Sequence, residues 1–241
     1  MDDTPPAHDL FVFLASTAHD MKNSISVVSG TLERLLDEAA PGTPLHNDSA
    51  YLQMAQMLYQ TRRLNDKLMQ LLALYKEVGT PAYPFDVALT DVAQLAAQVA
   101  AANRVLLAAR GIRLDIALDI DTPPGLCWHL DEDLVIGVVN HAINNATRYT
   151  RDRIVLSLVV VDDMLEIRVE DNGSGFPPAL LAAGAGAGRT RAVDFGTNSA
   201  GLGLYFATEV AKMHVHRGTP GTVRLENGGR FDGGCFILRL P

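Results

Sequence analysis

The sequence predicts an α+β chain in which an N-terminal helical hairpin precedes an α/β sandwich, with helices on one face of a mixed sheet. Two observations lead to this fold class. Apolar residues recur every three or four positions between residues 10 and 75, whereas helical and strand-like segments alternate after Pro84. With 241 residues, 48% of them hydrophobic, the chain is long enough for two domains, which we place at 1–80 and 84–241.

The N-terminal part contains two amphipathic helical patterns separated by Pro41-Gly42-Thr43-Pro44. The first comprises Leu14, Ala18, Met21, Ile25, Val28, Leu32 and Leu35, and the second comprises Leu58, Thr61, Leu64, Leu68, Leu71 and Tyr75. Because two helices alone cannot cover each other's apolar stripes, we expect a homodimer in which two hairpins form a four-helix bundle. A two-helix arm packed on the following domain of the same chain is the alternative.

The C-terminal part alternates between helical and strand-like segments. We expect helices at 90–110, 131–149 and 201–214, and strands at 112–118, 154–161, 165–170, 222–226 and 235–240. Asp162-Asp163 predicts a hairpin turn between two of these strands. Residues 177–200 are rich in Gly, Ala and Thr with little periodicity, which predicts a mobile lid.

Composition excludes several classes of function. The net charge of −8 and the lack of a basic run argue against nucleic-acid binding, which requires clustered Lys and Arg. Apolar stretches are too short for a membrane helix, and the first twenty residues lack the Lys or Arg of a signal peptide. Cys127 and Cys235 lie in apolar strand-like runs, which predicts buried thiols and a cytoplasmic location.

Three short motifs could carry chemistry. Asp171-Asn172-Gly173-Ser174-Gly175 follows a strand and would bring backbone close to a flat or anionic ligand, although ordinary turns share this composition. Gly201-Leu202-Gly203-Leu204 begins a helix, where free amides favour phosphate, although a simple helix cap is equally possible for such a pair. Asn144-Asn145-Ala146-Thr147-Arg148-Tyr149 places two poor helix formers inside a helix, which suggests a ligand or metal role.

Together and in this order, the three motifs resemble the N, G1 and G2 boxes of the ATP-binding domain of two-component sensor histidine kinases. This domain is the ATPase fold shared by the GHKL superfamily. The stretch from Gly233-Gly234-Cys235-Phe236 to Pro241 resembles the glycine-led final strand of the same family. The resemblance covers residues 86–241.

The first helix carries a further motif, Ala18-His19-Asp20-Met21-Lys22-Asn23-Ser24-Ile25, which is similar to the phosphoacceptor box of the same family. His19 lies outside the apolar stripe, so its imidazole should be reachable by the γ-phosphate of ATP. Neutral His19 would attack that phosphate while Asp20 accepts the proton of the other ring nitrogen. Asn23, one helical turn later, would orient water for dephosphorylation of a partner.

The resemblance implies a site for ATP and Mg²⁺. Asp171 would bond the adenine amino group, Asn145 would hold Mg²⁺, Arg148 would meet phosphate and Tyr149 would flank the base. The other implied contacts with nucleotide come from His141, Asn144, Gly173, Gly175, Gly201, Leu202, Gly203 and Leu204.

Three positions depart from the family pattern. His141 stands four residues before Asn145, where relatives generally carry Asn, so the metal geometry there is open to question. Ser24 replaces a Pro that usually bends the helix below the phosphoacceptor, and Phe195 is the sole aromatic candidate in the lid. His214 and His216 lack a third ligand nearby in sequence, so we do not expect them to bind metal.

The sequence therefore favours an ATP-dependent protein-histidine kinase that passes phosphate from His19 to an aspartate of a response-regulator receiver domain, with possible phosphatase activity. No sensor domain is encoded in these residues, so we expect the signal to come from a separate sensor or upstream protein or from a segment missing here. The alternatives are a docking or phosphorelay module that does not use ATP, a nucleotide-gated conformational ATPase, and a serine kinase of the anti-sigma type.

Overall fold

The computed structural model describes residues 21, 24–39, 42–43, 48–75, 85–118, 125–183 and 200–241, which form two compact units, residues 1–84 and 85–241. His19, Asp20, Asn23 and Phe195 lie outside the described residues. Within the described part of the chain, no helix is long and apolar enough to cross a membrane.

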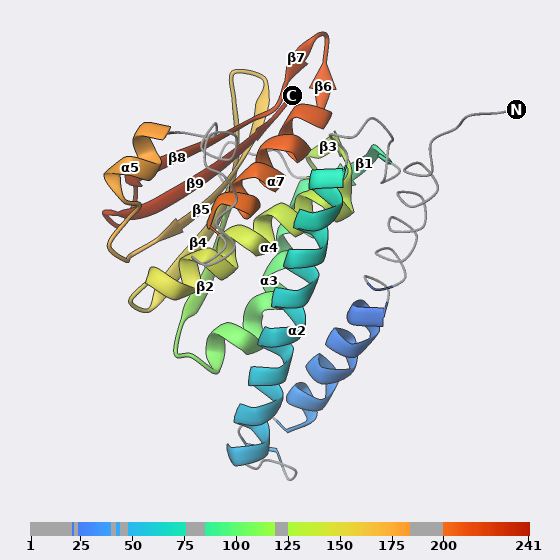
Figure 1. The fold of residues 1–241 in the computed structure, drawn as a ribbon, viewed down its shortest axis with the longest axis vertical. Coiled ribbons are helices and arrows are strands. Elements are labelled where there is room, and N and C mark those ends of the chain that lie inside the picture. Colours follow the sequence, from blue (N-terminus) through green and yellow to red (C-terminus); the bar gives the residue numbers. More distant parts are fainter. Residues whose placement is uncertain are drawn as a thin grey trace, which may run out of the picture. The chain divides into compact units, whose positions relative to one another are not determined.

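The described part of the first unit consists of two helices, at residues 24–38 and at α2, Asp48–Tyr75 (Figure 1). A salt bridge of 2.7 Å joins Arg62 Nη2 on α2 to Glu33 Oε1 on the preceding helix. Leu36 and Leu58 are fully buried. Because the ion pair links two helices joined by a short connection, they lie beside one another; pairing with a second copy stays a prediction.

The second unit is built on a five-stranded mixed sheet with the order β2-β4-β5-β9-β8. Its strands are β2 Arg113–Leu118, β4 Arg153–Val161, β5 Met164–Asp171, β8 Thr222–Gly228 and β9 Gly233–Leu240. The β2–β4 pair is parallel and the other pairs are antiparallel. Helices α3 Val92–Ala108, α4 Glu132–Tyr149 and α7 Ala200–Met213 cover one face of the sheet (Figure 1).

The predicted helices and strands of this unit are therefore confirmed as a mixed sheet with helices. The Asp162-Asp163 turn is also confirmed: both residues have positive φ, 52° and 58°, as a tight hairpin turn requires. Five short elements were not predicted, namely β1 Ala88–Asp91, β3 Cys127–Leu130, α5 Pro178–Ala183, β6 Val215–His216 and β7 Thr219–Pro220. Of these, α5 occupies the start of the segment predicted to be an aperiodic lid.

The prediction for the two thiols was half wrong. Cys235 is buried in the sheet, where burial raises the pKa of its thiol to about 12. Cys127 is exposed, because β3 pairs only with β1 in a two-stranded sheet and its residues alternate between open and covered positions.

The side chains of α4 explain both its boundaries and its burial. Asp131 precedes the helix and its Oδ1 accepts a hydrogen bond from the Leu134 amide at 3.0 Å, which caps the N-terminus. Val135 and Ile143 lie on the apolar stripe and are fully buried. The stripe docks the helix on the sheet, so the residues on its other side are positioned by core packing.

His214 connects the end of α7 to the start of α4. Its Nε2 accepts a hydrogen bond from the Asp131 amide at 3.0 Å, and its Nδ1 lies 2.8 Å from the Val210 carbonyl oxygen, to which it donates. The Phe85 ring packs edge-on against the imidazole, with centroids 5.0 Å apart. Burial lowers the pKa of His214, against the Val210 bond and the Asp131 charge, which both raise it. The neutral imidazole is thus a structural link.

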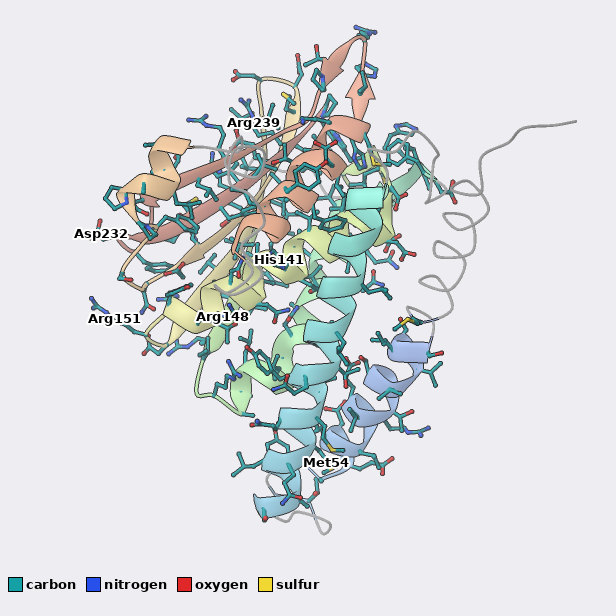
Figure 2. The ribbon with its side chains drawn as sticks, viewed as in Figure 1. Met54, His141, Arg148, Arg151, Asp232 and Arg239 are labelled. Carbon is teal, nitrogen blue, oxygen red and sulfur yellow. The ribbon has the colours of Figure 1, made fainter. Side chains whose placement is uncertain are left out.

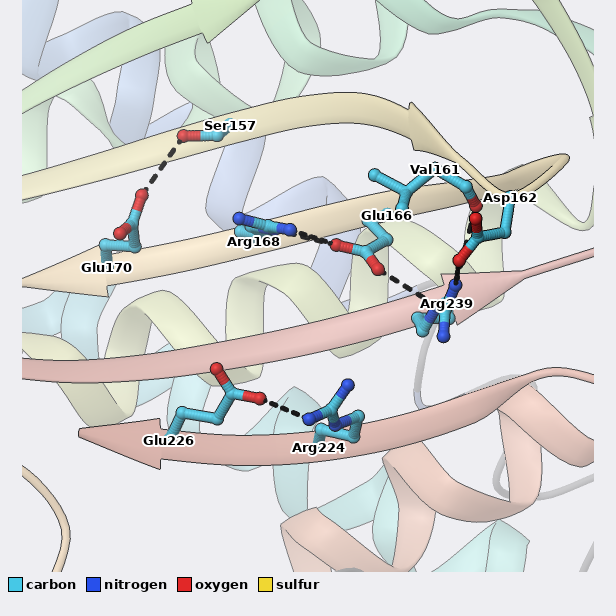
Figure 3. A network of polar contacts seen from close by, with 9 residues as sticks. All are labelled: Ser157, Val161, Asp162, Glu166, Arg168, Glu170, Arg224, Glu226 and Arg239. Atoms are coloured by element: carbon cyan, nitrogen blue, oxygen red, sulfur yellow. Dashed lines mark hydrogen bonds and ion pairs between the residues drawn. The ribbon is translucent and has the colours of Figure 1, made fainter. Parts of the chain in front are cut away.

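The opposite face of the sheet carries a network of charged side chains (Figure 3). Glu166, which is buried, pairs with Arg168 on the same strand and with Arg239 Nε at 3.0 Å on β9. Glu170 is also buried and accepts a bond from the Arg230 amide at 3.0 Å. Each buried carboxylate has a partner, as burial of charge requires.

Candidate functional site

Asp171 is the last residue of β5 and pairs with Ile154 of β4, so its side chain projects to the helix-covered face of the sheet. The residue is only 6% exposed. Burial raises the pKa of its carboxyl, and hydrogen bonds from the Gly173 and Gly234 amides oppose that shift. The Gly173 bond is 2.7 Å long. The result is a carboxylate fixed in direction and poor in solvent, suited to a ligand with a polar hydrogen.

The glycines around Asp171 are required by close packing of backbone. A Cβ at Gly173 would lie 2.1 Å from the Tyr149 carbonyl oxygen, and one at Gly233 would lie 2.0 Å from that of Asp171. A Cβ at Gly234 would lie 2.9 Å from Asp171 Oδ2. The ends of β5 and α4 and the start of β9 therefore pack together so closely that only glycine fits at these positions.

The side chain of Asn172 organises the turn that follows α4. Its Oδ1 accepts bonds from Thr150 Oγ1 at 2.8 Å and from the amides of residues 151, 152 and 153 at 3.1–3.3 Å. Its Nδ2 donates to Asp152 Oδ1 at 2.7 Å. Sequence reasoning missed this role because the partners lie about twenty positions away.

Asn227 holds the other end of the motif. Its Oδ1 accepts from the Phe176 amide at 2.6 Å and its Nδ2 donates to the Phe176 carbonyl at 2.9 Å, a pairing that imitates a strand ladder. Gly175 has a φ of +76°, and a Cβ there would lie 2.7 Å from Asn227 Oδ1. The loop after Asp171 is thereby anchored to β8, a contact no local signal in the sequence indicates.

The glycine motif at residues 201–204 meets the asparagine motif at residues 144–149 beside His141. Nε2 of His141 lies 3.0 Å from Nδ2 of Asn145, one turn later on α4. A Cβ at Gly203, in the first turn of α7, would lie only 1.6 Å from the same Nε2. The start of α7 and the middle of α4 are therefore in contact through Gly203 and the imidazole of His141.

The remaining predicted residues lie on α4 and at the start of α7. Arg148 and Tyr149 are exposed at the end of α4, Tyr149 by 61% (Figure 2 labels His141 and Arg148). Asn144 and Leu204 are buried. Gly201 and Leu202 lie in the first turn of α7. The structure thus brings Asp171, Gly173 and the end of α4 together, and separately brings His141, Asn145 and Gly203 together.

The donor set suits ATP with a divalent cation. Among the described residues, no group of three or more His, Cys, Asp or Glu side chains could hold a metal by itself. A Mg²⁺ ion usually takes one or two protein ligands and completes its shell with phosphate oxygens and water. The amide oxygen of half-buried Asn145 fits such a partial shell, and the Asp171 carboxylate offers a fixed acceptor to a polar hydrogen of a base.

Residues 130–241 match the histidine kinase-, DNA gyrase B- and HSP90-like ATPase family. The family resemblance is confirmed. The match begins just before α4 and runs through β9, so it contains Asp171 and all three motifs of the site.

Two curated relatives are named as kinases or sensors. The chain is 29% identical over 246 residues to the signal transduction histidine-protein kinase AfsQ2 of Streptomyces coelicolor, covering 95% of this chain and 41% of the relative. It is 23% identical over 237 residues to the sensor protein SrrB of Staphylococcus aureus, covering 95% of this chain and 37% of the relative. The chain therefore spans about two fifths of the length of these relatives.

Two solved structures share the fold. The catalytic domain of histidine kinase ThkA, in a nucleotide-free form, gives a TM-score of 0.52 at 15% identity and covers 65% of this chain and 96% of that one. The Acinetobacter baumannii histidine kinase AdeS gives a TM-score of 0.52 at 18% identity over 92% of this chain and 96% of that one. At these identities the likeness concerns the fold alone.

Proposed function

We propose that this chain is an ATP-dependent histidine kinase that phosphorylates its own His19 and passes the phosphoryl group to an aspartate of a response-regulator receiver domain. The observation that carries the proposal is the buried Asp171 carboxylate, held by the Gly173 amide at 2.7 Å where Gly173, Gly233 and Gly234 let backbone and carboxylate pack closely. The match to the ATPase family and the kinase-named relatives support it.

Each residue of the site has a proposed part in binding nucleotide. Asp171 accepts a hydrogen bond from the adenine amino group, which its direction and its dry surroundings favour. Exposed Tyr149 flanks the base, and exposed Arg148 reaches the phosphates as a fixed positive charge. Gly201 and Gly203 give the phosphates access to the amides at the start of α7.

Asn145 holds Mg²⁺ through its amide oxygen, and the bound ion supplies neutralisation of charge on the phosphates. The other predicted contacts with nucleotide, from His141, Asn144, Gly173, Gly175, Leu202 and Leu204, are part of the same proposal.

The chemical step belongs to His19. A ring nitrogen of the neutral imidazole forms a bond to the γ-phosphorus, the bond to the bridging oxygen breaks, and ADP leaves. Asp20 takes the proton of the other ring nitrogen. A receiver aspartate then attacks the phosphohistidine, which regenerates His19. In the phosphatase reaction, Asn23 and Asp20 orient a water molecule that attacks the phosphorylated aspartate of the partner and releases inorganic phosphate.

A homodimer is the second part of the proposal. Among the described residues of the first unit, seven large apolar side chains are exposed in the single chain: Met21, Val27, Val28, Leu35, Leu52, Met57 and Leu64. Four of them, Met21, Val28, Leu35 and Leu64, belong to the predicted apolar stripes. Such a row is typical of helices that pair with another copy. We also propose that the signal reaches this chain from a separate sensor or upstream protein, because its relatives are named as a signal transduction kinase and a sensor protein.

Sedimentation equilibrium tests the dimer. We expect wild type to sediment as a dimer and Leu64→Glu as a monomer, because the substitution places charge in the seam. Leu89→Glu, at an equally exposed position in the second unit, should leave the dimer intact. A monomeric wild-type chain would refute this part of the proposal.

The kinase proposal is tested with γ-labelled ATP and Mg²⁺. We expect acid-labile, base-stable label on wild type and none on His19→Gln. His216→Gln is the matched control, since His216 is an exposed histidine outside the site, and it should label normally. Nucleotide binding without label would instead favour a conformational ATPase, and label that survives in His19→Gln would exclude His19 as the acceptor.

A further inference from the structure

His141 brings a ring nitrogen beside Asn145, the proposed metal ligand on the same helix. Nε2 of His141 and Nδ2 of Asn145 are 3.0 Å apart on the same face of α4. With the amide in this orientation, Nδ2 donates to Nε2, so Nε2 carries a lone pair directed toward the Asn145 amide group.

The two side chains can offer a metal both nitrogen and oxygen. Turning the terminal amide of Asn145 by half a revolution exchanges Nδ2 and Oδ1, two atoms whose assignment follows from the hydrogen bonds available. The oxygen then lies beside Nε2 at nearly the observed separation of 3.0 Å. Adjacent ligands of a six-coordinate ion at roughly 2.1 Å are about 3 Å apart, so the spacing suits a shared cation.

Gly203 keeps this position open. Since a Cβ there would lie 1.6 Å from Nε2, only glycine at the start of α7 allows the imidazole to occupy this place. The first turn of α7 also offers free amides to phosphate. Nε2 therefore lies close both to Asn145 and to the start of α7 at Gly203.

We infer that His141 and Asn145 form a mixed nitrogen and oxygen pair for the nucleotide-bound cation, so that this chain selects Mn²⁺ over Mg²⁺. Mg²⁺ takes oxygen ligands almost exclusively and sheds water reluctantly, whereas transition ions accept imidazole. Mn²⁺ is the member of that series that also tolerates a shell of phosphate and carbonyl oxygens. The inference rests on the proposed ATP site and concerns its metal.

The test compares wild type with His141→Asn in the full chain. The affinity for a non-hydrolysable ATP analogue is measured by calorimetry with Mn²⁺, with Mg²⁺ and with chelator. We expect the ratio of Mn²⁺-supported to Mg²⁺-supported affinity to fall about tenfold in His141→Asn, in the range that loss of a metal contact produces. Comparing ratios removes the intrinsic difference with which the two ions bind nucleotide.

A spectroscopic measurement on wild type gives an independent readout. Pulsed electron paramagnetic resonance of the Mn²⁺–nucleotide complex should show coupling to an imidazole nitrogen, and ¹⁵N labelling of histidine should change it. His141→Asn should lose the coupling, which separates His141 from nitrogens of the base.

The outcomes distinguish this inference from the proposed function. Equal metal ratios in the two proteins, with no nitrogen coupling in wild type, would overturn the inference while leaving the ATP site in place. Failure of the analogue to bind with either ion would overturn the proposed function and the inference together. If His141→Asn does not fold, His141→Gln is compared with wild type in the same two measurements.

Discussion

The contact between Gly203 and His141 predicts a strong, specific interaction between two substitutions. A Cβ at Gly203 would overlap His141 Nε2 at 1.6 Å, far inside van der Waals contact. We expect Gly203→Ala to lower the free energy of unfolding of the second unit by about 1–3 kcal/mol, the usual cost of forcing extra volume into a packed site.

The imidazole is the obstacle, so its removal should restore stability. We expect His141→Ala to remove most of the cost of Gly203→Ala, giving an interaction energy of about 1–2 kcal/mol in a double-mutant cycle. Urea unfolding followed by tryptophan fluorescence is a suitable assay. Trp128, the single tryptophan, lies in the second unit, and its Nε1 donates to the Pro241 carbonyl at 3.0 Å.

Gly137→Ala is the matched control. Gly137 also lies on α4, but a Cβ there would meet the Phe206 ring at 3.7 Å, which is ordinary contact. Alanine should therefore be neutral or stabilise the helix by up to about 1 kcal/mol. Additive effects of Gly203→Ala and His141→Ala would refute the packing on which the metal site depends.

Three further predictions concern Asp171, Asn172 and His214. Asp171→Asn should weaken nucleotide binding roughly 10- to 100-fold, as expected for a hydrogen bond to a charged group, while thermal stability holds or rises because burial disfavours the charged carboxylate; unchanged affinity by calorimetry would contradict the adenine contact. Asn172→Ala should destabilise the second unit by about 1–3 kcal/mol, since it leaves several turn groups without their acceptor. An unchanged free energy of unfolding in the Trp128 assay would disprove this structural role. His214 has a lowered pKa in the folded chain, so below its ordinary value of 6.5 the unfolded chain binds a proton that the folded chain does not, and stability should fall as pH decreases through 6.5; His214→Gln, measured in parallel, should show a smaller decrease, and equal slopes would exclude His214 as the cause.

The elements of the ATP-binding unit could be predicted because their signals are local. The apolar periodicity that places Val135 and Ile143 on one stripe of α4 is the same periodicity that buries them in the structure. The paired aspartates at 162 and 163 tolerate positive φ, which a tight turn needs. The short strands β1, β3, β6 and β7 have two to four residues each, too few to show a period.

The order of the three motifs, their residue types and the family they resemble were determined by the sequence alone, because glycine, carboxylate and amide positions are readable without coordinates. Contacts across the fold were not. Asn172 capping a turn twenty positions earlier, Asn227 pairing with Phe176, and His214 linking α7 to α4 depend on chain segments that meet only after folding. The tertiary structure alone also placed His141 against Gly203, because that contact arises where two helices far apart in sequence dock on the same face of a sheet.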